Sequence, residues 1–285
     1  MNQKIRRISS DKDQVSLPAR AYSGPETVGI EFDENPGEKC MVLQPGTTED
    51  DRRRLLSREM NDVVVWQDDF LGDIIDSKYT LLNGSDAQAL DPAIVADTQN
   101  GIVRLVCGND ATTTMAVNGS QLVLGRHWAP SAVAKGSIFM EARIDPSAIT
   151  DIVMFVGWTD SIALEMPFTI SGTTVTSNAT DAVGFVFDTA QTTDRFYAVG
   201  VDTNTDATEE LLDTAPAADA WIRLGVRVWD DGQAEFYING VKKGATMLLS
   251  TTPAVLLTPT VAVFSETTTS HTLDVDYLRV EGPRV

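Results

Sequence analysis

The chain has 285 residues, of which 42% are hydrophobic, so it is long enough for one large domain or for two small ones. Its 22 lysines and arginines face 41 aspartates and glutamates, and the net charge of −19 argues against nucleic acids and anionic membranes as partners of the main body. No run of about 18 apolar residues occurs, so no membrane-spanning helix is expected.

The charge is unevenly distributed along the chain. Residues 1–60 hold ten basic and eleven acidic residues, whereas residues 61–285 hold twelve basic and thirty acidic residues. The N-terminal sequence MNQKIRRISSDKD is basic but no apolar stretch follows it, so a secretory signal is not expected. Cys40 and Cys107 lie far apart and outside any metal-ligand spacing, which predicts two free thiols.

Residues 1–60 are expected to form an extended arm that attaches the protein to a partner. Prolines and glycines interrupt this segment, and its apolar runs at 28–32 and 40–43 are long enough to add strands to a sheet but not to build a core. The sequence TTEDDRRRLLSREM predicts a short helix with a threonine cap and an acidic first turn. A disordered tail is the alternative. The residues expected to contact the partner are Val28, Ile30, Phe32, Met41, Leu43, Leu55 and Leu56.

Residues 61–285 are expected to form one all-β domain. Short β-branched and aromatic runs alternate with Gly, Asn, Asp and Thr clusters, and this pattern is typical of antiparallel strands. The expected strands lie at residues 63–66, 101–107, 137–144, 151–158, 183–187 and 196–201.

The C-terminal third carries the clearest strand pattern. In residues 221–229 the even-numbered positions from Ile222 are apolar, and Arg223 and Arg227 lie on the other face. Asp231-Gly232 and Asn239-Gly240 predict tight turns on either side of the next strand. The last strand, TLDVDYLRV, is expected to bury Leu273, Val275 and Tyr277, or the residues that alternate with them. Many short strands with almost no helical periodicity predict an antiparallel sandwich or jelly roll.

Several of these sequences resemble a known family. W-I-R-L, D-G-x-A-x-F-Y-I-N-G and the closing D-V-D-Y-L-R-V are similar to concanavalin A-like (laminin-G-like) jelly-roll domains. Together with QDDFLGDIID, GIVRL and ITDIVMFVGWTD, they resemble structural proteins of tailed bacteriophages, over about residues 63–282. This resemblance implies a concanavalin A-like jelly roll that follows an arm and belongs to a virion.

The sequence offers little support for an enzyme. Glycosidases of this fold carry E-x-D-x-x-E on one strand, which presents alternate carboxylates to the same face. That motif is missing from the body, where Asp274 and Asp276 share a strand face without a third carboxylate. His127 and His271 lack a recognisable nucleophile beside them, and no phosphate-binding glycine-rich loop is present. The protein is therefore expected to be non-enzymatic, with glycoside hydrolysis as the remote alternative.

Two binding sites are considered as alternatives. Asp202, Asn204, Asp206 and Asp213 have a spacing similar to a calcium loop, but Ala207 replaces the turn glycine, so a solvated loop is favoured and no cofactor is expected. Carbohydrate binding would use an aromatic platform, for which the candidate residues are Trp128, Trp158 and Trp229. A place in the core or in a subunit interface is the favoured interpretation for these tryptophans.

An acidic jelly roll without catalytic groups, joined to an arm, is expected to be a structural protein. The resemblance implies a capsid decoration (cement) or head-fibre protein on the virion surface, made in the host cytoplasm and bound to the major capsid protein or another virion protein. A homotrimer is expected, because attachment at several points multiplies modest contacts. A glycan- or receptor-binding module of a phage tail or fibre is the alternative.

Overall fold

The computed structural model describes residues 63–96, 98, 101–130, 136–248 and 250–283, together with the backbone of two short strands, Glu31–Phe32 (β1) and Met41–Val42 (β2). The chain divides into two compact units, Met1–Asp62 and Val63–Val285. In the first unit β1 pairs antiparallel with β2, so these two expected strands pair with each other.

The second unit is built almost entirely from antiparallel strands, as predicted for the fold class. The first sheet, called sheet I, consists of β4 (Thr80–Asn83), β7 (Gly119–Val123), β9 (Ile152–Thr159), β12 (Ala182–Asp188), β13 (Tyr197–Asp202), β14 (Thr205–Asp206), β15 (Glu210–Leu211) and β19 (Thr258–Ser265). The second, called sheet II, consists of β3 (Val63–Asp68), β5 (Leu90–Ile94), β6 (Val103–Val106), β8 (Ile138–Pro146), β16 (Ile222–Val228), β17 (Ala234–Ile238), β18 (Val241–Met247) and β20 (Thr272–Pro283).

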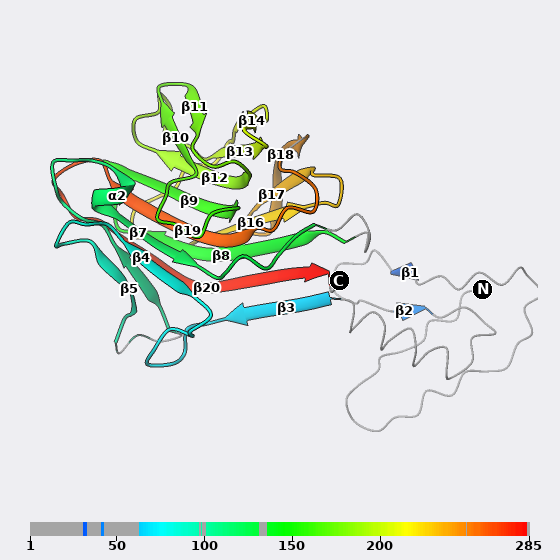
Figure 1. Ribbon diagram of the computed structural model, residues 1–285, viewed down its shortest axis with the longest axis horizontal. Coiled ribbons are helices and arrows are strands. Elements are labelled where there is room, and N and C mark those ends of the chain that lie inside the picture. Colours follow the sequence, from blue (N-terminus) through cyan, green and yellow to red (C-terminus); the bar gives the residue numbers. More distant parts are fainter. Residues whose placement is uncertain are drawn as a thin grey trace, which may run out of the picture. The chain divides into compact units, whose positions relative to one another are not determined.

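The two sheets pack face to face as a sandwich (Figure 1). The strand order of sheet I is β14-β13-β12-β9-β19-β7-β4, with β15 beside β13, and that of sheet II is β18-β17-β16-β8-β20-β6-β5, with β3 beside β20. A separate hairpin is formed by β10 (Phe168–Ser171) and β11 (Thr174–Ser177). The one helix of the described residues is α2 (Met115–Asn118), and none there is long and apolar enough to cross a membrane. The predicted antiparallel sandwich is confirmed.

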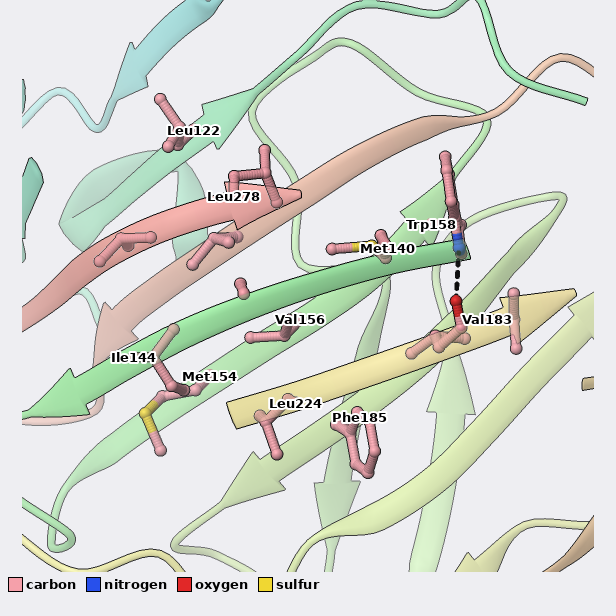
Figure 2. Packing of buried hydrophobic residues seen from close by; sticks show 14 of the residues in the cluster. Leu122, Met140, Ile144, Met154, Val156, Trp158, Val183, Phe185, Leu224 and Leu278 are labelled. Atoms are coloured by element: carbon pink, nitrogen blue, oxygen red, sulfur yellow. Dashed lines mark hydrogen bonds between the residues drawn. The ribbon is translucent and has the colours of Figure 1, made fainter. Parts of the chain in front are cut away.

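The core between the sheets follows from the period of two in their strands. Along β8 every second side chain is buried, beginning with Ile138, and the side chains between them face outward. Figure 2 shows core residues from both sheets packed against one another. The Phe185 ring of β12 meets the Phe236 ring of β17 edge-on at 5.4 Å between centroids. Trp158 Nε1 donates to the Val226 carbonyl at 3.4 Å, so this hydrogen bond also links the two sheets.

The predicted turn between β17 and β18 has the expected backbone. Asn239 has φ 53° and Gly240 has φ 80°, the two positive values that a type I′ hairpin turn requires. Asn239 Oδ1 also accepts a hydrogen bond from the Arg223 N–H at 3.0 Å. The turn is therefore anchored to β16 as well as connecting β17 to β18.

The last strand differs from the predicted alternation. Leu273 and Val275 are buried as expected, but the register of β20 against β8 shifts between Val275 and Tyr277. This bulge changes the parity of the strand, so Leu278 and Val280 enter the core and Tyr277 faces outward. The prediction that Tyr277 is buried was wrong, because an inserted residue cannot be read from alternation alone.

Candidate functional site

The outer face of sheet I is covered by the segment that connects β9 to β12. This segment contains the β10–β11 hairpin, and a second apolar cluster lies between it and the sheet. Phe155 of β9 packs against Phe168 of β10 with ring centroids 6.0 Å apart, and both rings are buried. The hairpin therefore forms an apolar, closely packed cover on this part of sheet I.

The carboxyl groups beneath and beside this cover hold it in place. Asp188 Oδ2 accepts from the Ile170 N–H at 2.7 Å, and its Oδ1 accepts from the Ala190 N–H at 2.8 Å. Thr159 Oγ1 donates to Glu165 at 3.2 Å. Burial raises the pKa of both carboxyl groups. Asp188 and Glu165 therefore serve to hold the cover on sheet I.

Within the described residues no segment covers the outer face of sheet II, and this face forms the candidate site, called here the sheet II surface. Its side chains alternate with the core residues of β6, β8, β16, β17 and β20, and Lys242 comes from the edge strand β18. They are Arg104, Phe139, Glu141, Arg143, Asp145, Arg223, Arg227, Glu235, Tyr237, Lys242, Asp274, Asp276, Tyr277, Arg279 and Glu281.

The sheet II surface is balanced in charge although the body is strongly acidic. It holds six of the twelve lysines and arginines that follow residue 60, but only six of the thirty acidic residues in that part. The remaining surface of the body therefore carries almost all of its net negative charge. A locally neutral face is the part of such a protein that can approach another protein with the least electrostatic repulsion.

Ion pairs between neighbouring strands order this surface. Arg104 of β6 makes two hydrogen bonds of 2.7 Å to the carboxylate of Asp274 on β20. Arg143 of β8 pairs with Asp276 at 2.6 Å. The guanidinium of Arg143 also lies over the Trp221 ring, 4.7 Å from its centroid. Two-point and stacked contacts fix the planes of these guanidinium groups, so the surface is organised before any partner arrives.

Aromatic rings gather around one arginine at the β16–β17 side of the surface. The Arg227 guanidinium lies 5.1 Å from the centroid of Phe139 and 5.5 Å from that of Trp229. Phe139 meets Tyr237 edge-on at 6.2 Å. Arg227 also donates to Ser137 Oγ at 2.9 Å. Trp, Tyr and Arg are the residue types that dominate binding energy in protein interfaces, so this group is the centre of the candidate site.

One acidic group of the sheet II surface stands apart from this pairing. Asp145 lies opposite Asp274 in the ladder between β8 and β20, and its Oδ1 is buried without a hydrogen-bond partner in the described residues. Burial, followed by repulsion from Asp274 and Asp219, raises the pKa of Asp145. The ionised form of this carboxyl group is therefore disfavoured in the folded protein.

A cavity of about 270 Å³ lies at the end of β3, away from the centre of the candidate site. Trp66, Asp68 and Phe70 are among its lining residues. One polar atom of a lining residue, Trp66 Nε1, is buried and lacks a hydrogen-bond partner within the described part of the chain. An unsatisfied donor beside a cavity of this size suits a small polar ligand or ordered water.

The proposed tryptophan platform does not exist as one surface. Trp158 is fully buried between the sheets, and Trp128 is half-buried against it, with ring centroids 6.4 Å apart. Trp229 alone is well exposed, at 39%, and it borders the sheet II surface beside Arg227. The favoured interpretation, a place in the core, is therefore confirmed for Trp158, and Trp158 cannot contribute to a glycan platform.

The calcium-like segment folds as a hairpin and a loop. Thr203 and Asn204 have φ values of 50° and 61° and form the tight turn between β13 and β14, and Asp206 follows on β14. Asp202 accepts from Thr252 Oγ1 at 2.6 Å, whereas Asp213 pairs with Lys243 at 3.0 Å. The four oxygen-bearing residues thus serve different contacts, and the described residues contain no group of three or more His, Cys, Asp or Glu arranged for a metal ion.

The other predicted positions are one of the two cysteines and the residues of the N-terminal arm. Cys107 is a free, buried thiol whose pKa is raised to about 12 by burial, so it is not a nucleophile at neutral pH. The helix expected within residues 47–60 lies outside the described residues. So do the arm side chains Val28, Ile30, Phe32, Met41, Leu43, Leu55 and Leu56.

Comparison with known proteins identifies the fold and no closer relationship. No family model matches the chain, and no curated protein sequence matches it. A protein of unknown function from Shewanella oneidensis MR-1 superposes with a TM-score of 0.50 at 13% identity, covering 84% of this chain and 96% of the other.

Two further similar structures are a glucanase and a carbohydrate recognition domain. The endo-1,3-beta-glucanase of Streptomyces sioyaensis superposes with a TM-score of 0.51 at 10% identity, covering 76% of this chain and 95% of its own. The carbohydrate recognition domain of Emp47p superposes with a TM-score of 0.50 at 9% identity, covering 77% and 96%. Because identities this low establish architecture alone, the body has the concanavalin A-like jelly-roll fold that glucanases and carbohydrate recognition domains share.

Proposed function

We propose that this protein is a non-enzymatic structural module that binds another protein through the sheet II surface. The observation that carries the proposal is the concentration of Arg227, Phe139, Tyr237 and Trp229 on a sheet face without net charge. Interfaces are enriched in these residue types, and the surrounding ion pairs provide the polar rim. The outer face of sheet I is covered by the β10–β11 segment, which leaves less of that face available to a partner.

The partner that we propose is a virion protein, with the chain acting as a capsid decoration or head-fibre protein on the particle surface. The resemblance to tailed-phage structural proteins supports this choice. The N-terminal arm would add a second attachment to the same partner, and a trimer would multiply both contacts. Binding to the assembled lattice in preference to free subunits would stabilise the particle.

Co-sedimentation with purified capsids tests the proposal. Replacing Arg227 by alanine removes the centre of the aromatic group and is expected to raise the dissociation constant by roughly 30-fold. Arg195→Ala is the matched control, because Arg195 is an exposed arginine in the loop between β12 and β13. Equal binding by the two variants, or binding by neither them nor the unaltered chain, would contradict the proposal.

Glycan binding is the second candidate, and the cavity at Trp66 is the observation that favours it. Proteins of this fold include a glucanase and a carbohydrate recognition domain. Asp68 and Gln67 line this cavity, and their polar side chains could bind sugar hydroxyls. Saturable binding on a glycan array that is lost in Asp68→Asn, and kept in Asp213→Asn, would promote this function over the first.

A further inference from the structure

The sequence contains four Asn-Gly pairs, and the structure describes both residues of three of them. An asparagine followed by glycine can lose its side-chain amide without an enzyme, because glycine has no side chain to hinder attack by its backbone nitrogen. The fold determines whether the reacting groups are free to meet. The three described pairs are Asn83-Gly84, Asn118-Gly119 and Asn239-Gly240.

The Asn118-Gly119 pair is locked inside the body. Asn118 is fully buried, its Nδ2 donates to the Asp110 carbonyl at 2.9 Å, and its Oδ1 accepts from the Asp110 N–H at 3.0 Å. The Gly119 N–H donates to the Met115 carbonyl at the end of α2. Both the leaving amide and the attacking nitrogen of this pair are therefore held in other hydrogen bonds.

The Asn83-Gly84 pair is also held, although Asn83 is exposed. Asn83 Nδ2 donates to the carbonyls of Ala89 at 2.9 Å and Gly84 at 3.2 Å. The Gly84 N–H donates to the Gly119 carbonyl at 2.8 Å. A Cβ built on Gly84 would lie 2.0 Å from the Val117 carbonyl oxygen, so neighbouring backbone also keeps Gly84 from moving.

The Asn239-Gly240 pair differs from both. It forms the turn between β17 and β18, and both residues are exposed. Within the part of the chain that the structure describes, neither Asn239 Nδ2 nor the Gly240 N–H has a hydrogen-bond partner. Apart from its chain neighbours, a Cβ built on Gly240 would meet one heavy atom within 4 Å, Arg223 Nη2 at 3.7 Å. The turn therefore has room for the backbone change that brings the Gly240 nitrogen to the Asn239 side chain.

Arg223 places donors around the group that reacts. Its backbone N–H donates to Asn239 Oδ1 at 3.0 Å, and its Nη2 donates to the Asn239 carbonyl at 3.1 Å. Attack on Asn239 Cγ makes Oδ1 negatively charged, and a donor that is already bound to this oxygen stabilises the charge. The guanidinium cation also lies beside Gly240, where positive charge favours loss of the Gly240 amide proton.

We propose that Asn239 is a site of spontaneous deamidation. The Gly240 nitrogen forms a bond to Asn239 Cγ, the Cγ–Nδ2 bond breaks, and ammonia leaves with the proton of the Gly240 amide. Water then opens the succinimide ring at either of its carbonyls and gives aspartate or isoaspartate. In isoaspartate the main chain passes through Cβ and Cγ, which lengthens the turn by one atom and disturbs its hydrogen bonds to Arg223. This inference does not depend on the proposed function.

Incubation of the full folded chain in mildly alkaline buffer, followed by digestion and peptide mass spectrometry, tests the site. Asn83 is the matched control within the same molecule, because it is also exposed and followed by glycine. Conversion is expected to be at least about tenfold faster at Asn239, since reaction at Asn83 first requires its hydrogen bonds to open. Unfolding in urea should bring the two rates together. Equal rates in the folded chain, or a difference that persists in urea, would overturn the proposal.

Detection of isoaspartate identifies the product. Methylation by an isoaspartate-specific methyltransferase is expected to increase with incubation time and to map to the peptide that contains Asn239. Asn239→Gln keeps a side-chain amide but would have to form a larger ring, so this variant is expected to lose the signal. A synthetic peptide of sequence FYINGVKKG gives the rate without the fold. Absence of isoaspartate at Asn239 after this peptide has reacted fully would overturn the proposal.

Discussion

Asp145 shows how a single residue can limit the stability of a surface that is otherwise well paired. Its neighbours Asp274 and Asp276 each have an arginine partner, whereas Asp145 has no ion pair among the described residues. Its pKa is raised in the folded protein, so the free energy that favours folding falls as pH rises through that pKa. At neutral pH the ionised carboxylate therefore destabilises the fold.

Asp145→Asn is expected to stabilise the protein at pH 7, by up to about 1 kcal/mol after allowance for solvent screening. Near pH 4, where the native carboxyl group takes up a proton, the gain should shrink. Urea unfolding at the two pH values measures this difference. Asp213→Asn is the control of opposite sign, because its bond to Lys243 lowers the pKa of Asp213 and the substitution should destabilise at neutral pH. A loss of stability in Asp145→Asn at both pH values would show that the carboxylate stabilises the fold and would contradict the prediction.

At the scale of elements, the β10–β11 hairpin determines what sheet I can do. Its Phe168 and Ile170 are buried against the sheet, and Asp188 accepts the Ile170 N–H. The hairpin occupies the side of the sandwich where an open sheet face would otherwise be available. It therefore acts as a fixed cover and leaves sheet II as the accessible sheet.

Phe168→Ala is expected to lower the free energy of unfolding by about 3 kcal/mol, since it removes a buried ring packed on Phe155. Before global unfolding, the hairpin should open locally. Hydrogen exchange of the Ile170 amide measures that opening. Thr176→Ala is the control, because Thr176 is exposed on β11 and its substitution should leave exchange unchanged. Unaltered protection of Ile170 in Phe168→Ala would mean that the hairpin does not depend on this contact.

Strands with a strong period of two could be predicted from the sequence, and elements that depend on distant contacts could not. The alternation of β16 and the Asn239-Gly240 turn are local properties, and both appear as expected. The β10–β11 hairpin consists of two four-residue strands rich in threonine, and its burial comes from the sheet beneath it. The bulge in β20 likewise depends on its pairing with β8.

The candidate site was not predicted from the sequence because it, too, depends on contacts between segments far apart in the chain. The outward positions of Arg223 and Arg227 on β16 were predicted, which was the available signal. Their grouping with Phe139 and Tyr237 requires the pairing of β16 with β8 and β17, and alternation within one strand does not specify which strands are neighbours. The tryptophans, in contrast, were considered as a glycan platform because of their residue type alone, and Trp158 is a core residue.

For the whole molecule, acidity sets the pH at which the fold is most stable. Burial is the first cause of a raised pKa in four carboxyl groups, and each destabilises the folded state as pH rises through its pKa. These groups are Asp145, Glu165, Asp188 and Glu266. Four other carboxyl groups have lowered pKa values through hydrogen bonds, and their contribution is lost only in stronger acid. They are Asp76, Asp110, Asp213 and Glu235.

The melting temperature is therefore expected to be highest in mild acid, at roughly pH 4.5 to 6, and to fall toward pH 8. Reduced repulsion among the 41 acidic residues acts in the same direction, so added salt should narrow the difference. Burial lowers the pKa of His271, so this residue lowers the stability of the fold as pH falls below about 6.5. Scanning calorimetry from pH 4 to 9 checks the profile. A melting temperature that rises from pH 5.5 to pH 8 would contradict it.

The position of the body's first and last strands affects how it bears mechanical load. Val63 at the start of β3 lies directly opposite Pro283 at the end of β20, in antiparallel register. Tension applied through residues before 63 and after 283 would peel this pair apart from one end, breaking its hydrogen bonds one after another. Such an unzipping geometry yields at low force. In a shear geometry, where the pulled ends lie at opposite ends of the strand pair, all the hydrogen bonds would be loaded together. A tether on one end of the body alone leaves the β3–β20 pair unstrained.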